Sequence, residues 1–195
     1  IKGLELPSHD PRAFYSQALG YATSPRGACH LQSYSHGLEA WMTMPELGFP
    51  EIAERLSTER KGEMVAKMQN LMSLFDSLKT CKFVLYAGVE IKNLVEWLNA
   101  ITGWGFDRRD FLLAGERIFN LKTAFNRREG FRVKNDTLPL RFLKDISESK
   151  FERMKRDYYT FRGWNEEGIP LPETIERLGL TSVDFFTTFA GARRR

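Results

Sequence analysis

MVAKMQNLMSLFDSLKTC, residues 64–81, contains the longest helical pattern in this chain. Its apolar side chains recur at intervals of three and four residues: Met64, Met68, Leu71, Leu74 and Phe75. This spacing places them on one face of an α-helix, which we expect to end near Leu78. Asp76 lies near that end and Cys81 lies just past it, so a carboxylate and a thiol follow the helix closely in sequence.

Helical spacing also dominates on both sides of this stretch, with recognisable start and stop residues. Asp10-Pro11 and Asp107 have the character of helix starts, and Gly103 and Gly130 that of helix ends. The further helices expected are 10–22, 50–56, 91–101, 107–130, 151–159 and 172–178, with Leu94, Val95, Leu98 and Ile101 turned inward on the third. Residues 32–49 predict an irregular connection, and residues 83–86 fit either a buried strand or a helix start.

The fold class predicted from these patterns is all-α. We expect residues 1–195 to form one irregular helical region with active-site loops. With 195 residues and 42% hydrophobic composition, the chain can bury a substantial core. Residues 191–195 form a basic tail that we expect to be disordered.

Composition excludes several classes of protein. No apolar run approaches the roughly 18 residues of a membrane span, and the first residues lack the pattern of a signal peptide, so we expect a soluble cytoplasmic protein. Two cysteines do not make a disulfide framework. The formal charge of +4 depends largely on Arg193–Arg195, and no aromatic-interleaved basic segment accompanies it, so nucleic-acid binding is not expected.

Asp76 to Cys81 (DSLKTC) resembles the Asp-x-x-Gly-Leu-Cys motif of the tungsten-dependent aldehyde ferredoxin oxidoreductases. Four further segments resemble the C-terminal part of those enzymes in the same order: IKGLELPSHDPR (1–12), YATSPRGACHL (21–31), FNRREGFRVKNDTLPLRF (125–142) and YYTFRGWNEEGIPLPETIERLGL (158–180). The resemblance covers nearly the whole chain. It implies that the chain is part of a larger enzyme.

The resemblance implies that Asp76 holds a pterin and that Cys81 ligates a [4Fe–4S] cluster. A pterin presents an amino group and a ring N–H side by side, and a carboxylate can accept both hydrogen bonds. A [4Fe–4S] cluster needs four cysteines, and the other three are implied to lie upstream of this chain. Both the cluster and the tungsten (or molybdenum) bis-pterin would therefore need the upstream region.

The sequence departs from the family motif at two positions, where Lys79 and Thr80 replace Gly and Leu. The glycine allows the chain to leave the helix through a left-handed residue. A lysine in that conformation costs on the order of 1 kcal/mol. Either the loop takes another path or the chain accepts the strain.

His30 is the candidate acid–base group, because it lies in the segment that resembles the substrate-side loop of the family. A structural histidine is the alternative interpretation. His36 is a weaker catalytic candidate, and His9 is read as structural. Gln32 is a candidate polar contact to the cofactor, and Cys29 is interpreted as a packed thiol.

Two charged segments are interpreted as packing and loop-fixing elements rather than catalytic clusters: Arg127-Arg128-Glu129 and Arg162-Gly163-Trp164.

The function implied is the oxidation of aldehydes to carboxylic acids by the C-terminal part of a tungsten iron–sulfur enzyme, inactive as a fragment, with ferredoxin as electron acceptor. Its other partners would be the remaining domains and the aldehyde. An aryl-CoA reductase-type relative and a catalytically inactive, stand-alone helical interaction domain are the alternatives.

Overall fold

A computed structural model of the protein describes residues 1–183, and its regular structure over that range is all helical. The α-helices are α1 (Tyr15–Thr23), α2 (Gly37–Ala40), α3 (Lys61–Leu78), α4 (Ile91–Thr102), α5 (Arg108–Arg128), α6 (Leu140–Ile146), α7 (Glu148–Arg162) and α8 (Pro172–Arg177). Short 3-10 turns are η1 (His30–Gln32), η2 (Pro45–Leu47), η3 (Lys82–Ala87) and η4 (Val133–Asn135). The all-α prediction is confirmed.

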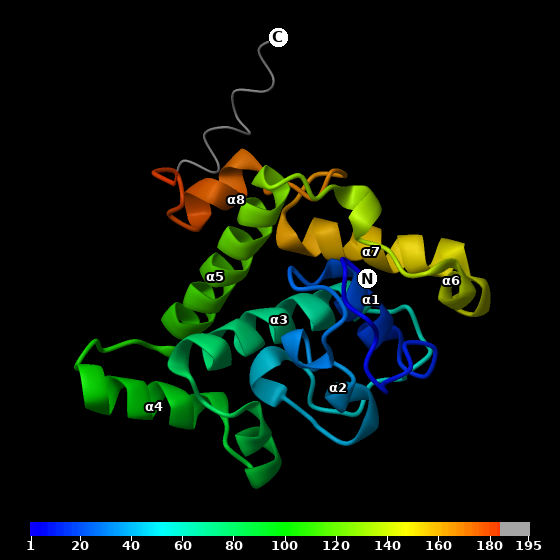
Figure 1. Cartoon of the computed structure of the whole chain (residues 1–195). Coiled ribbons are helices and arrows are strands. Elements are labelled where there is room, and N and C mark those ends of the chain that lie inside the picture. The colour runs from blue at the N-terminus through cyan, green and yellow to red at the C-terminus, as the bar shows by residue number, and fades with distance from the viewer. Residues whose placement is uncertain (184–195) are drawn as a thin grey trace.

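Helix α3 lies at the centre of the arrangement, packed against α1, α5 and α7 (Figure 1). Two glycines allow the close crossings. A Cβ on Gly62 would lie 2.5 Å from the backbone nitrogen of Tyr158 on α7, and one on Gly115 of α5 would lie 2.5 Å from the carbonyl oxygen of Asn70. Backbones approach so closely at these points that a larger residue would force the helices apart.

The apolar core divides between the two sides of α3. One cluster joins α3 to α1, α6 and α7 and includes Leu19, Val65 and Phe151. The other joins α3 to α2, α4 and α5 and includes Met68, Phe75 and Phe111. The second cluster extends toward the C-terminal end of α3, where the predicted cofactor residues lie.

Arg162 is a fully buried cation at the α3–α7 interface. Its guanidinium donates to the Gln69 side chain at 2.9 Å, the Ala66 carbonyl at 3.0 Å and the Asn70 side chain at 2.5 Å. Nearby, the Trp164 indole N–H donates to the Asn120 side chain at 2.8 Å. These contacts confirm that Arg162-Gly163-Trp164 is a structural segment.

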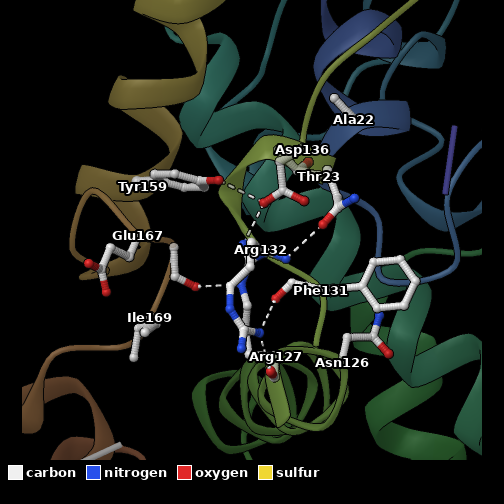
Figure 2. Close-up of polar contacts among 12 residues, drawn as sticks. Ala22, Thr23, Asn126, Arg127, Phe131, Arg132, Asp136, Tyr159, Glu167 and Ile169 are labelled. Atoms are coloured by element: carbon white, nitrogen blue, oxygen red, sulfur yellow. Dashed lines mark hydrogen bonds and ion pairs between the residues drawn. The ribbon is translucent and has the colours of Figure 1, made fainter. Parts of the chain in front are cut away.

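Asp136 is the centre of a second buried polar network, in which Tyr159 of α7 and Arg127 of α5 point toward its carboxylate (Figure 2). Arg127 Nη2 lies 2.6 Å and Tyr159 Oη 2.7 Å from Oδ2, and Lys2 Nζ lies 2.7 Å from Oδ1. Burial tends to raise the Asp136 pKa, but the two cations outweigh it and the pKa is lowered. The structural interpretation of Arg127 is therefore confirmed.

Local signals predicted several helix ends well. α3 ends at Leu78 and α4 stops at Gly103, which is left-handed with φ of 70°. Asp107 caps α5 by accepting the Asp110 N–H at 2.8 Å. The segment 83–86, for which strand and helix were both open, lies within the 3-10 turn η3.

Other predictions were wrong. The helix at 50–56 does not form, because its backbone pairs elsewhere: the Ala53 N–H donates to Leu38, and the Arg55 carbonyl accepts from Tyr15. That bond also marks the start of α1, four residues later than Pro11. Ile101, predicted to point inward, is 84% exposed.

The short helix α6 was not predicted, and the tail 191–195 lies outside the described residues.

Candidate functional site

The chain reverses direction at the C-terminal end of α3 through Lys79. This residue is left-handed, with φ of 57° and ψ of 28°, and the N–H groups of Lys79 and Thr80 both donate to the Phe75 carbonyl. The chain thus accepts the strained conformation where the family motif has glycine, at a cost of about 1 kcal/mol. Cys81 then adopts an extended conformation and leads into η3.

A cavity of about 280 Å³ lies against this turn. Three of the four predicted site residues line it: Asp76, Gln32 and Cys81. The remaining lining residues are Arg26, Cys29, Leu31, Thr80, Lys82 and Phe83. Residues from the connection after α1 therefore meet residues from the end of α3, although about 45 positions separate them in the sequence.

Asp76 is held by groups from both segments. Lys82 Nζ lies 2.7 Å from Oδ1, Gln32 Nε2 donates to Oδ2 at 3.3 Å, and Lys122 Nζ lies 3.7 Å from Oδ2. Partial burial tends to raise the Asp76 pKa, but Lys82, Lys122 and Gln32 outweigh it and lower the pKa. The carboxylate is therefore ionised at neutral pH and acts as a hydrogen-bond acceptor.

Lys82 was not singled out from the sequence, yet it organises this site. Its ammonium group bridges the Asp76 carboxylate and the Leu31 carbonyl, to which it donates at 2.8 Å. The bridge ties η1 to the end of α3. Lys82 directly follows Cys81, but nothing in its sequence position indicates a contact with residue 31.

Both cysteines are free thiols, and they line the same cavity. Cys81 is exposed, and Cys29, interpreted from the sequence as packed, is half-buried. Within residues 1–183, no group of three or more His, Cys, Asp or Glu side chains is arranged to hold a metal ion. One cluster thiolate from Cys81 would need partners from outside this set, as the resemblance implies.

His30 does not line the cavity, although its neighbours Cys29, Leu31 and Gln32 do. Its ring stacks on that of His9, with centroids 4.1 Å apart and an interplanar angle of 11°. Burial, with smaller contributions from His9 and Lys82, lowers the pKa of His30, so the imidazole is neutral at pH 7.

His36 completes a cluster that contains all three histidines of the chain. Its ring centroid lies 5.4 Å from that of His9 and 6.2 Å from that of His30. His36 is 3% exposed, and its Nδ1 finds no hydrogen-bond partner within the described part of the chain. Burial, with His9 and His30, lowers the pKa of His36 to about 4.

The donor set fits the cofactor groups that the resemblance implies. Asp76 offers two acceptor oxygens to a pterin edge, and the Gln32 amide beside it can both donate and accept. Cys81 presents an exposed thiol on the wall of the same cavity. None of the helices described at residues 1–183 is long and apolar enough to cross a membrane.

Comparisons with known proteins show which family this chain resembles. The model of the family described as aldehyde ferredoxin oxidoreductase, domains 2 and 3, matches residues 1–180. The tungsten-containing aldehyde ferredoxin oxidoreductases of Pyrococcus furiosus and Thermococcus kodakarensis are each 36% identical to this chain. Each match covers 92% of this chain and 30% of the relative.

Two further proteins are similar to this chain at lower sequence identity. The aliphatic sulfonate oxidoreductase, WOR-like subunit, of Pyrococcus furiosus is 25% identical over 92% of this chain and 27% of its own length. The BamBC active-site complex of benzoyl coenzyme A reductase, with bound 1,5-dienoyl-CoA, has a similar fold. One of its chains matches with a TM-score of 0.68 and 21% identity over 97% of this chain and 33% of its own.

The chain thus spans about 30% of the length of these two aldehyde ferredoxin oxidoreductases. The residues that the family model matches include the turn at Lys79, the residues that line the Asp76 cavity and the histidine cluster. The chain belongs to the aldehyde ferredoxin oxidoreductase family.

Proposed function

We propose that this chain is the C-terminal part of a larger cytoplasmic tungsten (or molybdenum) bis-pterin enzyme that oxidises aldehydes to carboxylic acids and passes the electrons to ferredoxin. The observation that carries the proposal is that Asp76, Gln32 and Cys81 line one cavity at the end of α3. Family membership supports the same conclusion. In the reaction, an aldehyde and water give a carboxylic acid, two protons and two electrons.

Asp76 and Gln32 are the proposed pterin anchors. The metal–pterin group would supply the two-electron redox chemistry when bound. The ionised Asp76 carboxylate would accept hydrogen bonds from the pterin edge through the lone pairs that Lys82, on Oδ1, and Gln32, on Oδ2, leave free. Lys82 would then keep the carboxylate charged and oriented from the other side.

Cys81 is the proposed cluster ligand contributed by this chain. Its thiolate would join three cysteines from the rest of the protein. Because Asp76 and Cys81 face the same cavity, the pterin and the cluster would lie close together, as electron transfer from one to the other requires. Ferredoxin would receive the electrons from the cluster.

His30 is the proposed acid–base residue. The neutral imidazole can donate a hydrogen bond to a substrate carbonyl or accept a proton from water. The stacked ring of His9 restricts the rotation of the His30 ring and so orients it. His36, fully enclosed, is less able to reach a substrate.

The pterin assignment is tested with Asp76→Asn in the full-length protein. An amide presents one acceptor and an unwanted donor where two acceptors are needed, so pterin and tungsten content should fall. Asp157→Asn, at an exposed position on α7, is the matched control and should keep both. Wild-type cofactor content in Asp76→Asn would overturn the assignment.

The role of His30 is tested with His30→Ala. Activity per bound tungsten should fall by about 10² to 10⁴-fold, the range typical of acid–base groups, while the tungsten content stays unchanged. A structural histidine would instead lower the melting temperature and leave activity per bound tungsten at the wild-type value. That second outcome would remove His30 from the mechanism.

A further inference from the structure

A second cavity, of about 270 Å³, has aromatic rings at three of its six lining residues. Its walls are Tyr34, Trp41, Met42, Thr43, Leu85 and Tyr86, so no charged side chain lines it. The rings of Trp41 and Tyr86 stack with centroids 5.9 Å apart, and the Tyr34 ring stands nearly perpendicular to that of Tyr86 at 6.1 Å. We call this feature the aromatic pocket.

Two rings of the aromatic pocket are accessible on the surface of this chain. Trp41 is 48% exposed and Tyr86 is 59% exposed, whereas Tyr34 at the base is buried. Aromatic side chains of this size normally bury most of their surface. The exposed faces therefore offer contact area for a flat apolar group, and the lining gives a charged ligand no counter-charge.

The aromatic pocket adjoins both parts of the proposed active site. On one side, the His36 ring lies 5.3 Å from Tyr34 and 5.4 Å from Trp41, and His30 lies beyond it at 6.2 Å. On the other side, Phe83 contacts both Tyr34 and Tyr86 and also lines the Asp76–Cys81 cavity. A ligand in the pocket would therefore lie beside both the histidine cluster and the cofactor cavity.

We propose that the aromatic pocket binds the ring of an aromatic aldehyde and makes Trp41 and Tyr86 specificity-determining residues. This inference rests on the proposed function and adds the substrate class. An apolar cavity of roughly 150 Å³ is enough to hold benzene, so the pocket has room for a substituted ring. Offset and perpendicular ring contacts with Trp41, Tyr86 and Tyr34 would favour an aromatic ligand over an aliphatic one.

The test compares benzaldehyde with acetaldehyde as substrates of the full-length enzyme. Trp41→Ala should lower the ratio of kcat/KM for benzaldehyde to kcat/KM for acetaldehyde by about 10- to 100-fold. Trp41→Phe, which keeps a ring, should retain most of the ratio. Trp97→Ala is the matched control, because Trp97 is 50% exposed on α4 and lines neither cavity; it should leave the ratio unchanged.

A binding measurement separates this inference from the proposed function. Benzamide, a neutral planar analogue, should quench tryptophan fluorescence in the wild type and in Trp97→Ala, and the quenching should be lost in Trp41→Phe. Absence of aldehyde oxidation by the wild type would refute the proposed function and leave this binding result as the test of the pocket.

Equal losses of kcat/KM for both aldehydes in Trp41→Ala would overturn the inference and indicate that the rings pack against another part of the protein. Quenching that persists in Trp41→Phe would overturn it as well. If Trp41→Ala does not fold, as judged by its melting curve, Tyr86→Leu replaces it with the same expected shift in the ratio.

Discussion

The first half of α3 and its C-terminal end differ in how their polar side chains are paired. Around the first half, Lys61 forms a buried ion pair with Glu39, and Arg162 has a partner for each of its nitrogens. Beyond the end of the helix, Cys81 is exposed, and His36 Nδ1 has no partner within residues 1–183. Polar groups around the first half of α3 are thus buried and paired, whereas those beyond its C-terminal end include an exposed thiol and a ring nitrogen that is unpaired among the described residues.

The two aspartates Asp136 and Asp76 are both paired but differ in exposure. Both have lowered pKa values and a lysine within 2.7 Å. The Asp136 side chain is 5% exposed and enclosed by Lys2, Arg127 and Tyr159, whereas that of Asp76 is 37% exposed on a cavity wall. Asp136 therefore stabilises the fold, while Asp76 remains accessible to a ligand.

The largest effect is expected from removing the enclosed carboxylate. Asp136→Ala leaves Lys2 and Arg127 buried without a counter-charge, and we expect a loss of about 3–5 kcal/mol in the free energy of unfolding. Asp76→Ala should lose only about 1 kcal/mol, because the Asp76 side chain is 37% exposed and Lys82, although 10% exposed, keeps its hydrogen bond to the Leu31 carbonyl. Chemical denaturation of both variants measures the difference, and equal losses would break the contrast between the two aspartates.

A similar loss is expected where α3 crosses α7. In Gly62→Ala the new methyl group would lie within 2.8 Å of three backbone atoms of Asp157 and Tyr158, so we expect about 2–3 kcal/mol of destabilisation. Gly103→Ala is the control: its Cβ meets no atom within 4 Å, and only the cost of positive φ, about 1 kcal/mol, remains. Thermal unfolding distinguishes the two, and the reverse order would show that the crossing can relax.

The histidine cluster should make stability depend on pH. His36 has a folded-state pKa of about 4 against 6.5 when unfolded, so the unfolded state binds the proton more readily. The contribution of His36 to the free energy of unfolding is complete above pH 6.5 and is lost as the pH falls toward 4. Between pH 7.5 and pH 5 the free energy of unfolding should fall by about 2 kcal/mol. The pKa of His30 is also lowered, so its protonation at acid pH should destabilise the folded state as well.

Denaturation of the wild type and His36→Phe at both pH values isolates this contribution. The variant should show a smaller loss of stability at pH 5, with the remainder due to His30. Identical pH profiles would mean that the His36 ring is protonated as easily in the folded protein as in the unfolded chain.

The smallest effect is expected at the turn that follows α3. Lys79→Gly removes the strain of a left-handed lysine and should stabilise the protein by about 0.5–1 kcal/mol. The change restores the glycine of the family motif, so the cofactor content of the full-length variant should be at least as high as that of the wild-type enzyme. A lower melting temperature for Lys79→Gly would indicate that the lysine makes a compensating contact.

Helix positions marked by local chemistry were predictable from the sequence, as the Asp107 cap and the Gly103 stop show. The family motif also singled out Asp76 and Cys81, which line one cavity in the structure. The missing helix at 50–56 was not predictable, because distant backbone groups of Leu38 and Tyr15 decide it. The Lys82–Leu31 bond and the stack of His9 on His30 also depend on tertiary contacts that no local pattern encodes.

The most direct test of the central claim is the iron content of the full-length protein after replacing each of the two cysteines in turn. Cys29 and Cys81 line the same cavity, so Cys29→Ser is a closely matched control for Cys81→Ser. If the end of α3 is the cofactor face, Cys81→Ser should lose most of the iron and Cys29→Ser should keep the wild-type content, with both variants folded. Wild-type iron in Cys81→Ser, or loss confined to Cys29→Ser, would contradict the account.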